Sequence, residues 1–169
     1  MRLKLPIVWA HRTMQTNKYP SKYQIRRAQR CDIQSIIAFA ESLHNQHSWS
    51  GIFNKSWKAQ YLEETVICQD RICLVCELES LIVGYALACL ECEEAIELNR
   101  CRLTELWIDE EHRRLGLAGQ MLTIILQWAD SKHTFEVEVN VGVDNPFKPE
   151  RLFKSQGFVA RSAKYVKVL

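Results

Sequence analysis

The residues best suited to chemistry lie in one stretch, Asp109–Leu122, with the sequence DEEHRRLGLAGQML. Small side chains gather in Gly116–Gly119, where a run of apolar residues with helical spacing begins. The first N–H groups of a helix lack internal partners, and the helix dipole adds partial positive charge there. Without bulky side chains a phosphate can reach these groups, and Arg113 and Arg114 can add charge. The same residues also suit a tight strand-to-helix turn that binds no ligand.

The composition indicates a single soluble globular domain. The chain has 169 residues, of which 47% are hydrophobic and 25% charged, enough to bury a full core. A net charge of +2 is too small to indicate a nucleic-acid surface, and no apolar run approaches the ~20 residues of a membrane span. We therefore expect neither a nucleic-acid partner nor a membrane. Seven cysteines in strand-like runs, without a secretory signal, favour free thiols and a cytoplasmic location.

Residues 1–22 differ from the rest of the chain. They carry five basic side chains and no acidic one, a bias found both in solvated arms and in organellar transit segments. We expect a basic N-terminal arm over 1–22, followed by one folded domain over 23–169.

Alternating and β-rich stretches predict a mostly antiparallel sheet of six to seven strands. A hairpin should turn at Glu79-Ser80, and an acidic connection at Glu93–Arg100 should lead to the next strand. The further strands are expected at Tyr23–Ala28, at Cys101–Asp109, at Thr134–Gly142 and, as one or two strands, within Phe158–Leu169.

About four helices should flank this sheet, which makes the fold class α/β (α+β). The first should begin after Asp32 as its N-cap. Its buried face should comprise Ile33, Ile36, Ile37, Ala40 and Leu43. The second should have Trp57, Tyr61 and Leu62 on its apolar side. The last two are expected at Gly116–Ser131 and Pro149–Gln156, the latter ended by Gly157.

The loop resembles a motif of a known family. Arg113–Ala118 (RRLGLA) fits the Arg/Gln-x-x-Gly-x-Gly/Ala loop of the GNAT superfamily of acyl-CoA-dependent N-acyltransferases. Leu152–Phe158 (LFKSQGF) is similar to the Leu-Tyr-x-x-x-Gly-Phe segment found downstream in that family. The expected element order is similar as well, over Tyr23–Leu169.

The resemblance implies acetyl-CoA as cosubstrate and no metal. In the family, the loop amides hold the coenzyme A pyrophosphate, and the preceding strand, here Thr104–Asp109, pairs with the pantetheine arm. The coenzyme-binding residues that it implies are Leu106, Trp107, Ile108, Arg113, Arg114, Leu115, Gly116, Leu117, Ala118, Gly119, Asn145 and Phe153. Asn145 also suits a plain turn, and His112 at the mouth of the loop suits a loop-shaping or phosphate-adjacent role.

Acyl transfer to an amine needs a neutral amine, and a lysine-like amine has a pKa near 10.4. At pH 7 roughly one in two thousand is neutral, which corresponds to about 4–5 kcal/mol. Glu105 is our candidate general base, with a solvent-facing strand glutamate as the alternative, since a one-residue offset would turn it to the other face. Many family members have a tyrosine where this chain has Phe153, which cannot donate a proton. Tyr165 is the other catalytic candidate, although its place in the last strand also suits packing.

Two features bear on the acceptor. Glu91, Glu93, Glu94 and Glu97 form an acidic cluster that favours a cationic amine, or else a solvated loop. Trp49, Phe53, Trp57 and Tyr61 lie in a region that often lines the acceptor site in the family, or else they belong to the core. The C-terminal segment also looks somewhat like the aminoglycoside 6'-N-acetyltransferase branch.

The expected function is therefore N-acetyl transfer from acetyl-CoA to a primary amine. The acceptor would be a small cationic amine or a lysine or N-terminal amine of a protein or peptide. The alternative is a catalytically weak acyl-CoA-binding sensor or regulatory module of the same fold. Monomer and homodimer both remain open, because this architecture exposes edge strands.

The cysteine spacing CxxC…CxxC at Cys73, Cys76, Cys89 and Cys92 suggests a zinc site. Strand alternation opposes it, because Cys73 and Cys76 should point to opposite faces. The hairpin register should also put Cys73 opposite Ala86, about 10 Å from Cys89 at the usual strand rise. His44-x-x-His47 has no evident third ligand. We therefore expect no metal.

Overall fold

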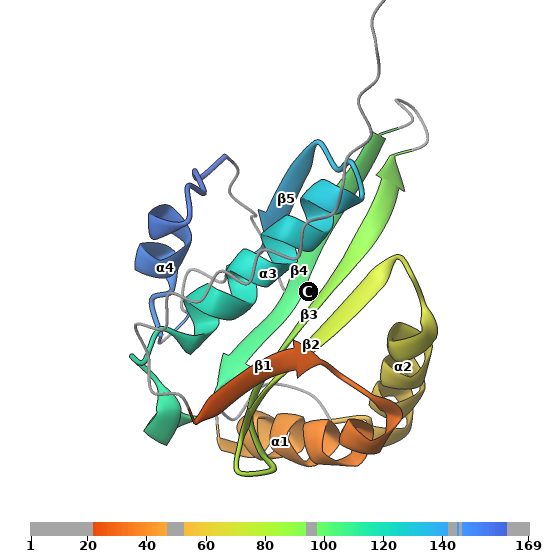
Figure 1. Ribbon diagram of the computed structural model, residues 1–169, viewed down its shortest axis with the longest axis vertical. Coiled ribbons are helices and arrows are strands. Elements are labelled where there is room, and N and C mark those ends of the chain that lie inside the picture. Colours follow the sequence, from red (N-terminus) through yellow and green to blue (C-terminus); the bar gives the residue numbers. More distant parts are fainter. Residues whose placement is uncertain (1–21, 47–52, 94–97, 142–144, 146, 162–169) are drawn as a thin grey trace, which may run out of the picture.

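The computed structural model describes residues 22–46, 53–93, 98–141, 145 and 147–161 (Figure 1). Within these ranges a five-stranded sheet has the order β1-β2-β3-β4-β5. The first four strands are antiparallel neighbours, and β5 runs parallel to β4. The strands are β1 (Tyr23–Arg27), β2 (Arg71–Leu78), β3 (Leu81–Glu93), β4 (Leu98–Ile108) and β5 (Glu136–Val139).

Helices cover both faces of the sheet (Figure 1). One face packs against α1 (Ile33–Gln46) and α2 (Lys55–Ile67), and the other against α3 (Leu117–Ser131) and the short α4 (Glu150–Ser155). The 3-10 turn η1 (Arg30–Asp32) precedes α1, and the 3-10 turn η2 (Glu110–His112) precedes the loop that leads into α3. The expected α/β (α+β) class with a mostly antiparallel sheet is thus confirmed. No helix in the described ranges is long and apolar enough to cross a membrane.

The sheet differs from the expectation at its far end. Five strands are present in the described residues, where six to seven were expected. Residues 158–161 are not in a strand, and 162–169, where the closing strands were also expected, lie outside the described residues, as do 1–21 of the expected arm. The predicted strand Thr134–Gly142 is shorter, confined to β5. The predicted short helix is present, and Gly157 after it has φ 84°, as a helix-ending glycine should.

Asp32 is not the N-cap of α1 that the sequence suggests. Its carboxylate is buried and accepts hydrogen bonds from the Arg26 guanidinium at 2.6 and 2.9 Å and from the Gln29 backbone N–H at 2.7 Å. The apolar face expected for α1 is confirmed, because its five residues are all buried. On α2 the expectation holds for Leu62, which is buried, but is wrong for Trp57, which is 60% exposed.

The hairpin between β2 and β3 turns at Glu79-Ser80 as expected. Both residues have positive φ, 48° and 70°, as the tight turns of two-residue hairpins require. A bulge between Cys76 and Glu77 then shifts the pairing by one residue, so Cys73 lies opposite Leu87 and not Ala86. Cys73 and Cys76 do belong to cores on opposite faces of the sheet.

Strands β3 and β4 approach each other closely at Gly84, which pairs with Ile108. A Cβ atom on Gly84 would lie 2.5 Å from Ile108 Cδ1 and 2.7 Å from the backbone oxygen of Trp107. The second contact is with backbone, which cannot move aside by a rotamer change. Only glycine therefore allows this spacing at the end of β4.

We predict that Gly84→Ala lowers the free energy of unfolding by about 1–3 kcal/mol, the usual cost of overpacking. Urea unfolding monitored by circular dichroism would measure the change. Gly119→Ala is the matched control, because its Cβ would lie 3.7 Å from Leu152 Cδ1, an ordinary contact, and alanine favours a helix. Equal midpoints for Gly84→Ala and wild type would show that β4 is not held at this spacing.

We also predict that Asp32→Asn lowers the free energy of unfolding by about 2 kcal/mol at pH 7, because hydrogen bonds to a charged partner are lost. The Arg26 hydrogen bonds hold the pKa of Asp32 below its usual value. The stabilisation is therefore complete above the unfolded pKa of about 3.9 and is lost as pH falls through the lower folded value. Urea unfolding at pH 7 and pH 3 should show the difference shrinking.

The control for Asp32→Asn is Asp70→Asn, which removes a carboxylate from an exposed ion pair. The Asp70 carboxylate is 68% exposed and lies 3.5 Å from Lys132 Nζ, so its removal should cost less than about 1 kcal/mol. A difference between Asp32→Asn and wild type that is the same at both pH values would contradict the proposed role of the Arg26–Asp32 pair.

Candidate active site

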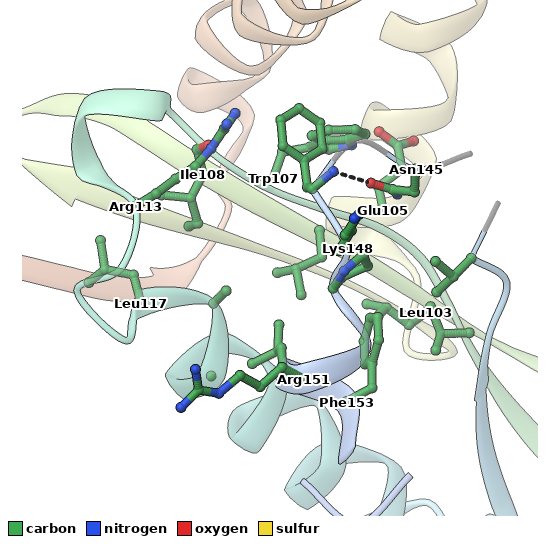
Figure 2. Close-up of a pocket in the computed structure, with 18 of the residues that line it drawn as sticks. Leu103, Glu105, Trp107, Ile108, Arg113, Leu117, Asn145, Lys148, Arg151 and Phe153 are labelled. Carbon is green, nitrogen blue, oxygen red and sulfur yellow. Dashed lines mark hydrogen bonds between the residues drawn. The ribbon is translucent and has the colours of Figure 1, made fainter. Parts of the chain in front are cut away.

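A cleft opens where β4 and β5 stop pairing. Their parallel register runs from Arg100–Glu136 to Leu103–Val139. Beyond it, residues 103–108 and residues 139–141 line a cleft of about 550 Å³, which we call the β4–β5 cleft. Figure 2 shows part of this lining, including Leu103, Glu105 and Trp107. The cleft begins at a bulge, because Leu87 pairs with Glu105 and Ala88 with Leu103. Thr104 is thus the extra residue, and its hydroxyl donates to the Leu87 carbonyl at 3.1 Å.

The N-terminus of α3 forms the floor of this cleft. Gly116 is its N-cap with φ 78°, and Arg114 also has positive φ, 61°, so the loop makes a sharp turn into the helix. The Gln120 N–H donates to the Gly116 carbonyl at 3.1 Å. The N–H groups of the three residues before it belong to the first turn, where backbone N–H groups have no partners within the helix. The four residues from Gly116 to Gly119 all line the cleft.

Gly119 has a second neighbour. Its missing side chain faces Leu152 and Gln156 at the end of α4. The small residue at this position therefore serves the packing of α3 against α4 as well as the cleft. It is not required by backbone geometry, because its φ is not positive.

Cationic side chains line the same cleft as the α3 N-terminus. Arg113 is held in place, since its Nε donates to the Ile108 carbonyl at 2.9 Å and its guanidinium lies 4.4 Å from the centre of the Phe147 ring. Glu105 is the single carboxylate in the described lining of the cleft. The Arg and Lys residues of the described lining are Arg113, Arg114, Lys148 and Arg151. Figure 2 labels three of them, Arg113, Lys148 and Arg151. N–H groups without partners inside the helix, together with these four cationic side chains of the described lining, suit a ligand with several phosphates.

Most residues expected at the coenzyme site line this cleft. They are Leu106, Trp107, Ile108, Arg113, Arg114, Gly116, Leu117, Ala118, Gly119, Asn145 and Phe153. Leu115 does not, because it packs against the core under α3. The Asn145 side-chain oxygen accepts a hydrogen bond from the Phe147 N–H at 3.0 Å (Figure 2). Phe153 is buried and meets Phe158 edge-on at 5.5 Å, while Tyr165 lies outside the described residues.

A second cavity of about 410 Å³ lies on the opposite side of β4, between α1, α2 and the sheet. We call it the α1–α2 cavity. Its walls include His44 and Leu43 of α1, and Trp57 and Lys58 of α2. It shares three lining residues with the β4–β5 cleft, namely Thr104, Glu105 and Trp107. The two hollows therefore meet across one short segment of β4.

Glu105 stands at this junction with two partners. Its Oε1 lies 2.5 Å from Lys58 Nζ, and its Oε2 accepts a hydrogen bond from the Tyr85 hydroxyl at 2.5 Å. The Lys58 side chain is only 5% exposed, whereas that of Glu105 is 28% exposed. The Lys58 ammonium also lies 5.3 Å from the centre of the Tyr85 ring. Glu105 is thus neither a solvent-facing glutamate nor an isolated carboxylate.

Tyr85 is a hydrogen-bond donor at this site. Burial, followed by the charge and hydrogen bond of Glu105, raises the pKa of Tyr85 well above its usual value. The phenol therefore keeps its proton at neutral pH and fixes the orientation of the Glu105 carboxylate.

The residues that the sequence did not single out are Lys58, Tyr85, Lys148 and Arg151. Lys58 follows Lys55 on α2 and resembles any solvated helix residue, and Tyr85 lies in the apolar run LIVGYALACL, typical of a core strand. Lys148 and Arg151 left a usable signal, because they flank Pro149 at the start of the predicted last helix. A basic pair near a second helix, downstream of the loop, could have been added to the phosphate site.

Of the acidic cluster, the structure describes the side chain of Glu91. Glu91 is in β3 and pairs with Arg102 at 2.8 Å, and it lines neither hollow. Glu94, Glu97 and Trp49, and the side chain of Glu93, lie outside the described residues. Of the expected aromatic residues, Phe53 and Trp57 line the α1–α2 cavity, and Tyr61 stacks on Trp57 at 5.3 Å.

Comparisons with solved structures place the fold among acetyltransferases. An aminoglycoside acetyltransferase from an uncultured soil metagenomic sample, in complex with sisomicin, has 16% identity and a TM-score of 0.68 over 88% of this chain and 97% of that chain. Glucosamine-6-phosphate N-acetyltransferase from Arabidopsis thaliana has 18% identity and a TM-score of 0.65 over 86% and 97%. A predicted acetyltransferase with acetyl-CoA from Clostridium acetobutylicum has 12% identity and a TM-score of 0.70 over 87% and 96%.

Sequence comparison gives the family directly. No curated protein sequence matches significantly. A family model described as the acetyltransferase (GNAT) domain matches residues 69–160, more than half of the chain. The match runs from just before β2 to just after α4 and includes the loop at the α3 N-terminus. The resemblance found in the loop is thus confirmed, and the chain belongs to the GNAT acetyltransferase domain family.

Proposed function

We propose that this protein transfers an acetyl group from acetyl-CoA to a primary amine. The observation that carries the proposal is the meeting of two hollows at Glu105. One hollow has the charge and the helix N-terminus that suit a phosphate-bearing coenzyme. The other is walled mainly by apolar and aromatic side chains and opens on the same segment of β4. Two substrates bound from the two sides would have their reacting ends beside the same carboxylate.

The charge and the backbone groups of the β4–β5 cleft suit acetyl-CoA. The N–H groups of the loop and first turn, Arg114–Gly119, would hold the pyrophosphate, with Arg113 close by. Lys148 and Arg151, on the opposite wall, can contact further phosphate oxygens. The open edge of β4 beyond Leu103 offers backbone groups to the amides of the pantetheine arm. When bound, acetyl-CoA supplies an acetyl group activated as a thioester.

In the reaction the amine nitrogen attacks the thioester carbonyl carbon, a C–N bond forms and the C–S bond breaks. Glu105 accepts the proton that the amine must lose, directly or through a water molecule. The two hydrogen bonds on Glu105 leave part of its carboxylate lone pairs for this role. The departing thiolate is a good leaving group and takes up a proton from solvent, so the reaction can run with Phe153 in place of a tyrosine.

The state of Cys73, a cysteine near the site, supports direct transfer to the amine. Cys73, on the α1–α2 face, is buried, and burial raises its pKa to about 12. The thiolate is the nucleophilic form of cysteine, and at neutral pH almost none of it would be present. An acyl-cysteine intermediate at Cys73 is therefore disfavoured.

A second function is supported by two of the same observations. Phe153 has no hydroxyl, and the Glu105 carboxylate is already held by Lys58 and Tyr85. A protein with these features could bind an acyl-CoA and respond to it without turnover. Such a sensor would bind acetyl-CoA normally but would acetylate no amine.

We predict that wild-type protein binds acetyl-CoA with micromolar affinity and that Gly116→Asp abolishes binding. The new side chain would strain a residue with φ 78° and bring a negative charge to the phosphate position. Isothermal titration calorimetry would measure both affinities without interference from the cysteines.

The matched control is Gly157→Asp, because Gly157 also has positive φ, 84°, and a Cβ there would have no atom within 4 Å. It adds the same strain and charge outside the lining of the cleft, so it should retain binding. Equal affinities for Gly116→Asp and wild type would remove the loop from the coenzyme site.

We further predict that Glu105→Gln lowers kcat by about 10²–10⁴, the range for a general base, while the Kd for acetyl-CoA stays within about threefold. Steady-state turnover with an accepted amine and calorimetry would give the two numbers. Tyr85→Phe, which removes one hydrogen bond to the same carboxylate, should have a smaller effect. A kcat for Glu105→Gln within twofold of wild type would limit Glu105 to a structural role.

A further inference from the structure

We infer that the acceptor is a monoamine that carries an apolar group such as an aromatic ring, and that Lys58 sets this preference by cancelling the charge of Glu105. The inference rests on the proposed function and concerns the α1–α2 cavity. It disfavours the acceptors with several positive charges, such as polyamines, that the acidic cluster suggests. Two observations carry it, the composition of the cavity walls and the buried ion pair at its inner end.

The walls of the cavity are mainly apolar and aromatic. Phe53, Trp57, Tyr85 and Trp107 line it from four different segments, together with aliphatic residues of α1. The Phe53 ring also contacts the His44 ring at 5.8 Å. An apolar group of the acceptor would lose its water-exposed surface between these rings, which favours binding. A hydrated polycation would gain little from the same walls.

The charge of the cavity is balanced. Lys58 and Glu105 form an ion pair with a Nζ–Oε1 distance of 2.5 Å, and they are the only Lys, Arg, Asp or Glu side chains in its described lining. The Lys58 side chain is 95% buried, since only 5% of it is exposed. The ammonium is therefore fixed beside the carboxylate and cannot turn away to solvent. A cationic acceptor consequently meets a neutral pair and not a free negative charge.

The position of Lys58 extends this argument to a second charge on the acceptor. The reacting amine must lie near Glu105 to lose its proton there. An acceptor with two ammonium groups would bring its second charge into a cavity that already holds the Lys58 ammonium, with partial loss of water. An acceptor whose remaining part is a ring meets no such repulsion. Lys58 thus acts as a specificity-determining residue for the acetyl-transfer reaction.

Three amines test the inference. n-Butylamine is the reference, 2-phenylethylamine adds a ring, and 1,4-diaminobutane adds a second ammonium group. With wild type and saturating acetyl-CoA, the ring should raise kcat/KM by about tenfold or more. The second ammonium group should lower it by about tenfold or more. Coenzyme A release measured by mass spectrometry gives all three values.

Lys58→Met then removes the charge and keeps the length of the side chain. The ratio of kcat/KM for n-butylamine to kcat/KM for 1,4-diaminobutane should fall about tenfold in this variant. Lys58→Arg should keep the wild-type value of this ratio. Damage to the fold would reduce kcat/KM for all three amines together and leave their ratios unchanged. A change in the ratios therefore reports the charge at residue 58. The double variant Lys58→Met/Glu105→Gln provides a second measurement, because its lining is again neutral. Saturation-transfer NMR on its coenzyme A complex should detect 2-phenylethylamine and not 1,4-diaminobutane.

The possible outcomes separate this inference from the function on which it rests. If 1,4-diaminobutane is the best acceptor of wild type, or if Lys58→Met leaves the ratios unchanged, the inference is wrong and acetyl transfer stands. If acetyl-CoA binds but no amine is acetylated, both the proposed function and the inference fall, and the sensor is favoured. A wild-type preference for 2-phenylethylamine that depends on the charge of residue 58 supports the inference.

Discussion

The β-bulge at Thr104 determines the direction of every later side chain in β4. Before it, Cys101 and Leu103 belong to the core under α3. Simple alternation would place residue 105 on that same face. The extra residue at 104 instead turns Glu105 toward Lys58 and Tyr85 on the α1–α2 side, and returns Leu106 to the α3 side. The bulge thus brings the carboxylate to the boundary of the two hollows.

The same position also ends the pairing of β4 with β5. Their register stops at Leu103–Val139, one residue before the bulge. The cleft therefore opens at the point where the β4 side chains change direction. Behind this segment, Gly84 lets β3 approach β4 closely enough that no side chain fits between them. The wall of the cleft is consequently backed by a tightly packed strand, which is a suitable support for a substrate that pairs with backbone.

The sequence predicted those features that depend on local patterns. The Glu79-Ser80 turn, the apolar face of α1 and the loop at the α3 N-terminus each have a short-range signal of turn residues, helical spacing or small residues. The bulge has no such signal, because Thr104 is an ordinary strand residue between Leu103 and Glu105. An uncertainty of one residue in the register therefore left open the face on which Glu105 lies. Lys58 is 47 residues from Glu105, and only the packing of α2 on the sheet reveals their contact.

The buried pair also separates the electrostatics of the two hollows. Because Glu105 is bonded to Lys58 from the α1–α2 side, its negative charge is compensated there and offsets little of the positive charge around the α3 N-terminus. The β4–β5 cleft therefore keeps a field that attracts phosphates, since field strength in a cleft follows the charge that remains uncompensated. The α1–α2 cavity gains no net charge from this pair, so under the proposed function an acceptor would be held there chiefly by contact with the aromatic walls. In that proposal, one lysine would allow a polyanion and a largely apolar molecule to bind on opposite sides of the same strand.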